Sequence, residues 1–502
     1  MESSLLTTLV WATLVVAATA VLLWVLNRRH QHSLFRRYGI PGPKPDFFSG
    51  NWMQLKKNRL EVMESWIKTY GKVFGYYVGE VPYMVVTDLN IIKQCLVKEA
   101  NIAFDRPDLV VNVEPFTSCL IGLGGEEWKR IRATLNPIFT SAKMKMVTQI
   151  IQNCADEMLE VLADLVQKGE IVDMATVTRG FSMDVITKSA LAWQVDCQKN
   201  PTDPLLMGVQ KVFEDVDNAV IVNAIRFPIL RKILEWLYPY ASYYKIINKI
   251  TENVLNVVKL RRSGQSPRTT DMLQLMLDAQ TSGEESSIGS GSNATVFEDR
   301  HLLSNCFLFL IAGFDTTASS LAFIMHVLAK YPEEQERVFN EISKAFPDGA
   351  ELTYDGVQHL KRLDMVVCET LRLYPPVVLF VSRHCTRDTT VSGQFFPAGV
   401  NVLLPTWHVH HDPDFWPEPL KFDPERFSEG EKVQSAYFPF GLGPRVCIGK
   451  RFALLEVKLA TCNIIRRYRV SKCEQTQDPL RFVVPSVVLN PENGIRVRLQ
   501  KR

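Results

Sequence analysis

Hydrophobic positions begin the chain in one uninterrupted run. Residues 5–26 carry no charged side chain and are rich in leucine, valine and alanine. As a helix, this run is long enough to cross the ~30 Å hydrocarbon core of a bilayer. A cleaved signal peptide is the alternative, with a candidate site at residues 18–20, but the apolar run continues past that site and Glu2 stands where lysines are usual. We therefore predict an uncleaved membrane anchor over residues 1–27.

Charged and proline-rich positions follow the apolar run directly. No lysine or arginine precedes the run, whereas five basic residues follow it: Arg28, Arg29, Arg36, Arg37 and Lys44. The positive-inside rule then predicts a single-pass protein of the endoplasmic reticulum membrane with its body in the cytosol. The sequence Pro-Gly-Pro-Lys-Pro at residues 41–45 cannot continue a helix, so residues 28–45 are expected to form a basic, semi-rigid linker. Residues 46–502 are the expected globular domain.

The body of the chain is patterned mostly as helices. Residues 73–87 are rich in valine and tyrosine and are broken at Gly79 and Pro82, which predicts a pair of strands. Long helical patterns dominate elsewhere, so the expected fold class is mainly α with minor β. Residues 282–294 are polar and predict a surface loop. Asn293 in that loop matches a glycosylation acceptor, but a cytosolic body makes the match a chance one.

Apolar density rises again between residues 221 and 244. Residues 227–237 combine aromatic and aliphatic side chains with Arg231 and Lys232, and Arg226 comes just before them. Basic residues beside an aromatic-rich face suit a helix that dips into the membrane interface. They suit an amphipathic helix packed on the core equally well, so the sequence leaves both possibilities open.

Composition narrows the class of protein. The 502 residues carry a net charge of +3, which does not indicate nucleic acid binding. The 10 cysteines are scattered without paired spacings such as Cys-x-x-Cys. This pattern fits a reducing cytosolic compartment better than a disulfide framework.

One cysteine stands in a glycine-rich bend at residues 440–449, Phe-Gly-Leu-Gly-Pro-Arg-Val-Cys-Ile-Gly. The glycines, including Gly441 and Gly449, let the backbone curl around the sulfur of Cys447. Arg445 would help to keep a thiolate charged and could hold a haem propionate, while Phe440 would shield the sulfur from water. We interpret Cys447 as a thiolate ligand of haem iron.

Two other interpretations of this bend fit the sequence less well. A buried structural cysteine in a tight turn would not need the arginine and the phenylalanine at these spacings. A phosphate-binding loop fails because five residues, not four, separate Gly443 from Gly449, and Arg451 stands where serine or threonine is required.

A polar interruption marks the long apolar helix expected over residues 302–329. The sequence Ala-Gly-Phe-Asp-Thr-Thr runs from Ala312 to residue 317. Glycine inside a helix costs ~1 kcal/mol relative to alanine, and a buried carboxylate is costly unless it is paired or hydrated. Oxygen activation would justify both costs, because Gly313 removes bulk above the iron, Thr316 orients the reactants and Asp315 supplies protons through water. A tolerated polar kink is the alternative.

Further polar pairs at helical spacing are less specific. Trp128 and Arg132 lie four residues apart and would reach one haem propionate from the same helix face. Glu369 and Arg372 lie three apart, which alone indicates no more than a surface ion pair. The histidines His408, His410 and His411 match no familiar metal-ligand spacing and are expected to be structural.

From residue 41 to the C-terminus, the chain resembles the cytochrome P450 haem-thiolate monooxygenases, in particular the animal microsomal branch that oxidises xenobiotics. The cysteine bend at residues 440–449 carries the most specific part of the resemblance, and Pro-Glu-Arg-Phe at residues 424–427 adds to it. The resemblance implies the cytochrome P450 fold after a single transmembrane helix, with residues 46–502 as the haem-thiolate domain. It also implies a network in which Glu369 pairs with both Arg372 and Arg426, and a propionate contact from Arg383. Residues 227–237 would roof the substrate channel.

The function implied by the resemblance is insertion of one oxygen atom from O2 into a lipophilic substrate such as a xenobiotic, a steroid or another lipid. The cofactor would be haem b with Cys447 as axial ligand, and Ala312 would lie beside it. The expected partner is NADPH-cytochrome P450 reductase, with cytochrome b5 as a second candidate. Apolar surface for the substrate would come from residues 109–125, 377–380 and 482–488 and from Phe307, Phe309 and Ile311. A basic surface for the reductase would come from Lys129, Arg130, Lys450 and Arg451.

Two rival functions belong to other classes. A haem-thiolate isomerase or dehydratase acting on lipid peroxides would need no proton relay, so Asp315 and Thr316 count against it. A haem-based gas sensor would need neither that pair nor the apolar lining. The sequence does not name the substrate.

Overall fold

The computed structural model describes residues 2–100, 102–110, 112–191, 193–214, 218–265, 271–280, 297–347, 349–428, 435–485 and 487–502. The predicted surface loop at residues 282–294, with Asn293, lies outside the described residues.

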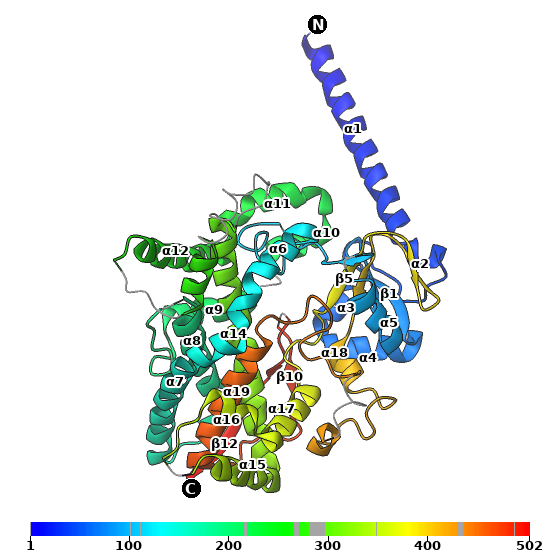
Figure 1. The fold of residues 1–502 in the computed structure, drawn as a ribbon. Coiled ribbons are helices and arrows are strands. Elements are labelled where there is room, and N and C mark those ends of the chain that lie inside the picture. The colour runs from blue at the N-terminus through cyan, green and yellow to red at the C-terminus, as the bar shows by residue number, and fades with distance from the viewer. Residues whose placement is uncertain are drawn as a thin grey trace, which may run out of the picture.

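The N-terminal helix α1 (Glu2–Gln31) projects away from the rest of the molecule (Figure 1). The most apolar 18-residue window between Thr7 and Gln31 has a mean hydropathy of 2.4, and this window is not buried by protein. This helix therefore has the properties of a transmembrane span. It also continues beyond residue 27, where the anchor was expected to end, so that Arg28 and Arg29 belong to the helix.

Helices make up most of the body, as the sequence predicts. Those of the N-terminal half are α2 (Leu34–Arg37), α3 (Trp52–Lys57), α4 (Arg59–Tyr70), α5 (Leu89–Lys93), α6 (Gly125–Leu135), α7 (Ser141–Gln167), α8 (Met174–Ile186), α9 (Pro204–Glu214), α10 (Ala219–Arg226), α11 (Arg231–Leu237) and α12 (Ser242–Arg262). Those of the C-terminal half are α14 (Asp299–Lys330), α15 (Pro332–Ala345), α16 (Tyr354–Gln358), α17 (Lys361–Leu373), α18 (Thr406–His410) and α19 (Lys450–Arg467).

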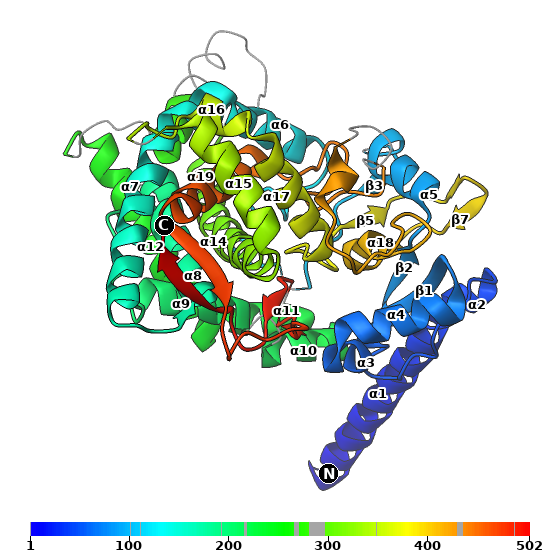
Figure 2. The same cartoon turned by 90° about the horizontal axis from the view of Figure 1, so that it is seen from below.

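Helix α14 is the axis of the helical part, and α8, α12, α15, α17 and α19 contact it (Figure 2). Its composition would allow it to span a membrane, but 83% of its most apolar window is buried inside the protein. The helix begins with a capping box between Glu298 and His301, and it ends at Lys330 because Pro332 starts the next helix. The predicted helix over residues 302–329 is confirmed.

The described residues also form four small sheets. The five-stranded sheet has the order β1 (Val73–Val78), β2 (Val81–Val86), β8 (Asn401–Leu403), β5 (Ser382–Cys385) and β3 (Phe104–Asp105). The predicted strand pair is confirmed, since β1 and β2 are antiparallel around a turn in which Gly79 has a φ of +60°. The remaining sheets pair β6 (Thr389–Val391) with β7 (Gln394–Phe396), β10 (Phe482–Val483) with β11 (Asn490–Pro491), and β12 (Arg496–Lys501) with both β4 (Val172–Asp173) and β9 (Tyr468–Lys472).

A fully buried ion pair ties α17 to the segment that leads to the cysteine bend. Arg372 donates to both carboxylate oxygens of Glu369, at 2.7 and 2.8 Å, and Nε of Arg426 lies 3.5 Å from the same carboxylate. Burial raises the pKa of Glu369, and the charge of Arg372 opposes that rise. Arg372 also donates to the carbonyls of His410, Pro419 and Lys421. Both arginines thus share one carboxylate and fix the backbone between residues 410 and 426.

The three neighbouring histidines are bonded to the backbone. His408 bonds the carbonyl of Leu60, His411 bonds that of Trp407, and His410 accepts the N–H of Phe438. In the part of the chain that the structure describes, the one cluster with metal-ligand spacing is acidic and includes none of these histidines. Their roles are structural, as expected.

The residues between α10 and α12 expose an apolar surface. They include η4 (Pro228–Leu230), α11 and η5 (Tyr238–Tyr240). Ile229, Trp236 and Tyr240 are 71%, 68% and 72% exposed, whereas Leu234 packs against the core. This degree of exposure is unusual for neighbouring large apolar side chains and favours the interfacial alternative left open by the sequence.

A buried acid in α19 makes folding depend on pH. Glu456 is fully buried, and neither of its carboxylate oxygens has a hydrogen-bond partner in the described chain. Ser182 opposes the effect of desolvation on Glu456, but its hydroxyl bonds the carbonyls of Gly313 and Phe314. Burial therefore raises the pKa of Glu456 well above the ordinary carboxyl range.

We predict that Glu456→Gln stabilises the protein increasingly as the pH rises. The folded state holds the proton of Glu456, while the unfolded chain releases it above pH ~4.3, so this residue's cost to stability grows from that pH until the raised pKa is passed. Circular dichroism melts between about pH 5 and about pH 8 should show the gain widening with pH. Glu252→Gln, at an exposed site on α12, is the matched control. A gain independent of pH would contradict a proton held by Glu456.

Candidate haem site

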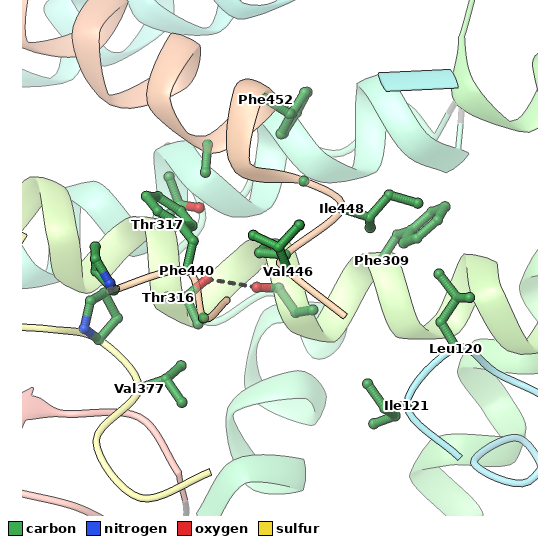
Figure 3. A pocket seen from close by; sticks show the side chains of 18 of the residues that line it. Leu120, Ile121, Phe309, Thr316, Thr317, Val377, Phe440, Val446, Ile448 and Phe452 are labelled. Atoms are coloured by element: carbon green, nitrogen blue, oxygen red, sulfur yellow. Dashed lines mark hydrogen bonds between the residues drawn. The ribbon is translucent and has the colours of Figure 1, made fainter. Parts of the chain in front are cut away.

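A cavity of about 320 Å³ lies between α14, α6 and the bend before α19 (Figure 3). Its walls are mainly apolar, and Figure 3 shows Phe309 and Thr316 on α14 on one side and Phe440, Val446 and Ile448 of the bend near them. Ten of the predicted site residues line this one cavity: Ala312, Thr316, Trp128, Arg132, Arg383, Phe440, Gly441, Arg445, Cys447 and Gly449. The structure thus brings together residues from four separate segments of the chain.

The shape of the cysteine bend depends on its glycines and backbone bonds. Gly443 has a φ of +73°, and a Cβ atom there would lie 1.9 Å from the carbonyl oxygen of Leu96. Only glycine fits this position. The N–H of Cys447 donates to the carbonyl of Phe440 at 2.9 Å, and the N–H of Val446 donates to that of Gly443 at 3.0 Å. These bonds close the bend and present the cysteine at its tip.

The accessible surface of Cys447 faces this cavity, while protein packs around its other sides. Burial raises the pKa of the Cys447 thiol. The N–H groups of Gly449 and Lys450 and the positive charges of Arg132 and Lys450 act in the opposite direction and favour the thiolate. A cation bound in the cavity against the sulfur would favour it further.

Arginine side chains crowd the rim of the cavity. Arg445 pairs with Asp105, donates to the carbonyl of Leu123 at 3.1 Å, and lies 4.1 Å from the ring centre of Trp128. Arg132 donates to the carbonyl of Val446 at 2.8 Å, next to the cysteine. Trp128 and Arg132 therefore lie on one face of α6, as their spacing predicts. The ring of Trp128 stacks on Arg445 of the bend.

Two more arginines that line the cavity, Arg383 and Arg106, are partly desolvated. Burial lowers the pKa of Arg383 to about 9, and the charges of Arg106 and Arg445 add to the effect. Burial likewise lowers the pKa of Arg106 to about 10, with Arg445 adding to it. Among the described residues, Arg106 has no carboxylate partner, and its guanidinium lies 4.5 Å from the ring centre of Phe380.

Sequence reasoning missed Arg106 and Asp105. The sequence did contain a signal for them. Asp105 and Arg106 are two opposite charges at the end of a short strand, and the mostly apolar residues 109–125 follow them. Its meaning depends on pairing across the sheet, where Asp105 on β3 lies opposite His384 on β5, beside Arg383. That register is set by tertiary structure and not by local pattern.

The residues present fit a haem. A mainly apolar cavity lined by a cysteine and by four arginines matches an iron porphyrin with two propionates. The buried Nε of Arg445 has no partner within the described chain, so a donor at the rim remains open to an anion. The site thus offers a thiolate on one side and cations at the edge.

The α14 side of the cavity carries Thr316, whose hydroxyl donates to the carbonyl of Ala312 at 2.7 Å (Figure 3). Gly313 also lines the cavity, but a Cβ atom there would first meet Ile186 of α8, at 2.7 Å. Close packing of two helices is therefore a physical reason for this glycine, in addition to the space over the cavity expected from the sequence.

Asp315 is the one predicted catalytic residue that does not line the cavity. Its carboxylate accepts from Nδ2 of Asn490 at 3.1 Å and lies 3.6 Å from Nε of Arg179. Burial raises the pKa of Asp315, and Arg179 opposes the rise. Asp315 thus lies behind Thr316, between the cavity and Arg179 on α8, whose side chain is one-third exposed. The sequence could not indicate either partner, because both come from distant segments.

The expected apolar lining is found in part. Leu120, Ile121, Phe309, Val377 and Phe380 line the cavity. Phe307 instead packs edge-to-face on Phe116, and the described part of residues 482–488 contributes Phe482, which packs on Tyr374 and Trp407. Ile311 and this segment are absent from the described cavity lining.

The four basic residues expected at a partner surface are exposed and lie at the junction of α6 with the start of α19. Lys129 and Arg130 belong to α6, and Lys450 and Arg451 begin α19. Arg451 donates to the carbonyl of Phe139, just beyond α6, and Arg132 bonds the cysteine bend. All four therefore lie around the sulfur side of the cavity.

Comparison with known proteins agrees with this site. The family model of cytochrome P450 matches residues 40–498. Cytochrome P450 3A29 of Sus scrofa is 36% identical over 98% of this chain and 97% of its own length, and cytochrome P450 3A5 of Homo sapiens is 35% identical over 97% and 96%. A lithocholate 6-beta-hydroxylase of Mesocricetus auratus is 34% identical over 98% and 97%. The chain therefore belongs to the cytochrome P450 family, whose members bind haem b through a cysteine thiolate.

Proposed function

We propose that this protein is a membrane-anchored monooxygenase that inserts one oxygen atom from O2 into lipophilic substrates, xenobiotics or steroids among them, with electrons from NADPH through a reductase. The main observation behind this proposal is that Cys447, in the bend before α19, and Thr316, on α14, line the same mainly apolar cavity. Haem bound there supplies the activation of O2, in which one oxygen atom enters the substrate and the other leaves as water. The names of the relatives, which include a steroid acid hydroxylase, support this substrate class.

The residues around the sulfur bind and orient the cofactor. Cys447 would be its axial ligand, held by the backbone bonds of the bend. Arg106, Arg132, Arg383 and Arg445 would neutralise the propionates, and Trp128 holds Arg445 in place by stacking. The apolar walls exclude water and accept the body of a lipophilic substrate.

The residues of α14 would manage protons. The hydroxyl of Thr316 is within the cavity and would orient oxygen by donating a hydrogen bond when it leaves the carbonyl of Ala312. Asp315 would relay protons from behind it, and burial raises the pKa of this carboxyl. Arg179 is one-third exposed and would connect Asp315 with solvent.

The surfaces of the molecule suit a membrane enzyme with a protein redox partner. We infer that α1 anchors the chain in the endoplasmic reticulum membrane, with residues 46–502 as the catalytic domain in the cytosol. The exposed apolar side chains of η4, α11 and η5 would enter the bilayer interface beside the anchor. The basic surface around Lys129 and Lys450 would attract an acidic NADPH-cytochrome P450 reductase, with cytochrome b5 as a second candidate.

The ligand assignment is tested by Cys447→Ser. A hydroxyl cannot supply the electron density of a thiolate, so the variant should lose the reduced carbon monoxide band near ~450 nm and its oxygenase activity, even where it retains haem. Cys473→Ser, at another partly exposed cysteine, should keep the band. A Cys447→Ser protein with a normal band would show that another residue is the ligand.

The role of Thr316 is tested by the coupling of electron use to product. Thr316→Ala should bind substrate and accept electrons normally, because neither step needs the hydroxyl, while product per NADPH falls and hydrogen peroxide rises by roughly tenfold. Thr316→Ser retains a hydroxyl and should restore most of the coupling. Product, peroxide and NADPH are measured in one reconstituted reaction. Unchanged coupling in Thr316→Ala refutes the role of the hydroxyl, and a main activity on hydroperoxides without NADPH would favour an isomerase.

A further inference from the structure

The end of the membrane helix is attached to the catalytic domain by a buried arginine. Arg28 belongs to α1, yet its side chain is fully buried by protein. Its guanidinium donates to the carbonyl of Arg226 at 2.8 Å and to that of Phe48 at 2.5 Å, and it lies 3.2 Å from Glu80. Its neighbour Arg29 is exposed. Arg28 thus joins four segments: the helix, the chain that follows it, the β1–β2 turn, and the end of α10.

Aromatic rings and a tight backbone contact surround this arginine. The guanidinium lies 5.6 Å from the ring centre of Trp24 and 5.8 Å from that of Phe47, and Trp24 lies 6.3 Å from Phe227. A Cβ atom at Gly79 would lie 2.3 Å from the carbonyl oxygen of Ile225, so the β1–β2 turn is in direct contact with α10. Since a buried charge is costly without partners, the arrangement is tightly determined.

The segment that starts at Arg226 continues to the loop over the cavity. On α11, Arg231 donates to the carbonyl of Leu109 at 2.6 Å, and Glu235 accepts the N–H of Asn112 at 3.1 Å. Arg231 and Glu235 also pair with each other at 3.1 Å. The loop held in this way leads to Leu120 and Ile121, which line the cavity.

These contacts form a continuous connection from the anchor to the cavity. The path runs from Arg28 through α10, η4 and α11 to the loop that begins at Leu109. The exposed apolar side chains of α11 lie on the same path and are the residues proposed above to meet the bilayer. A lipophilic compound dissolved in the membrane would meet this region first.

We propose that Arg28 is a positioning residue for entry of lipophilic compounds from the bilayer, because it fixes the α10–α11 roof relative to the membrane helix. The inference rests on the proposed function in so far as the substrates are lipophilic and enter from the membrane. Without Arg28, the anchor and the roof would be joined by the Trp24–Phe227 ring contact and would be held less rigidly, so the entrance would be less well fixed at the bilayer surface.

The test uses the full-length haem protein in phosphatidylcholine nanodiscs. Clotrimazole, a lipophilic azole that ligates haem iron, serves as the probe, and stopped-flow absorbance records its association rate. Arg28→Gln should slow association by roughly threefold or more in nanodiscs. The same variant should match the wild type in detergent micelles and with imidazole, a small water-soluble ligand. Arg29→Gln should match the wild type throughout.

A second residue on the path tests the connection itself. Glu235→Gln should also slow clotrimazole in nanodiscs, and the double variant with Arg28→Gln should be no slower than the slower single variant, because both break one path. Additive effects would overturn the path. If Arg28→Gln fails to fold, as judged by loss of the ~450 nm band, Glu80→Gln replaces it and should slow the same step.

Wild-type rates for Arg28→Gln in nanodiscs, or equal slowing in micelles and with imidazole, would overturn the proposal. Either result leaves the proposed activity untouched, because azole binding reports entry and not oxygen insertion. The proposed activity can also fail by itself. If the protein formed no oxygenated product but clotrimazole entry still depended on Arg28, only the proposed activity would be refuted.

Discussion

Mutual repulsion among buried guanidinium groups is the constraint on which the rest of this site depends. Arg106, Arg132, Arg383 and Arg445 line one cavity, and Asp105 is the carboxylate that pairs with one of them there. Like charges in a medium of low dielectric constant raise each other's free energy. Burial is the main cause of the lowered pKa values of Arg106 and Arg383, of about 10 and about 9, and repulsion from the neighbouring arginines adds to it. A thiolate and two propionates would supply the missing negative charge.

The surrounding structure keeps these charges in place when they would otherwise separate. The buried pair of Glu369 and Arg372 fixes the backbone that approaches the bend, and Gly443 allows the bend to pass against the carbonyl of Leu96. Helix α6 supplies Trp128 and Arg132 from one face. Because each support comes from a different segment, the site exists only in the complete fold. Helix α1 joins this assembly through Arg28, which donates to the carbonyl of Arg226 at the end of α10.

The sequence predicted those features whose physical signal is local. The apolar run of α1, the strand pair around Gly79 and the helix containing Thr316 follow from periodicity and composition. The bend at Cys447 could be predicted because its glycines, arginine and phenylalanine lie within ten residues. Pairings across the fold could not be predicted in this way. The partners of Asp315, the presence of Arg106 and the burial of Arg28 each depend on segments more than twenty residues away.

The central claim is that the arginines at the cavity rim bind the two carboxylates of haem. Its most direct test is to titrate the apoprotein with haem and with haem dimethyl ester, which keeps the porphyrin and the iron but has no charged propionate. If the arginines bind the propionates, the ester should bind at least ~10-fold more weakly, because each lost charge-assisted hydrogen bond leaves a buried donor unpaired. Equal affinity for the two porphyrins would contradict the account.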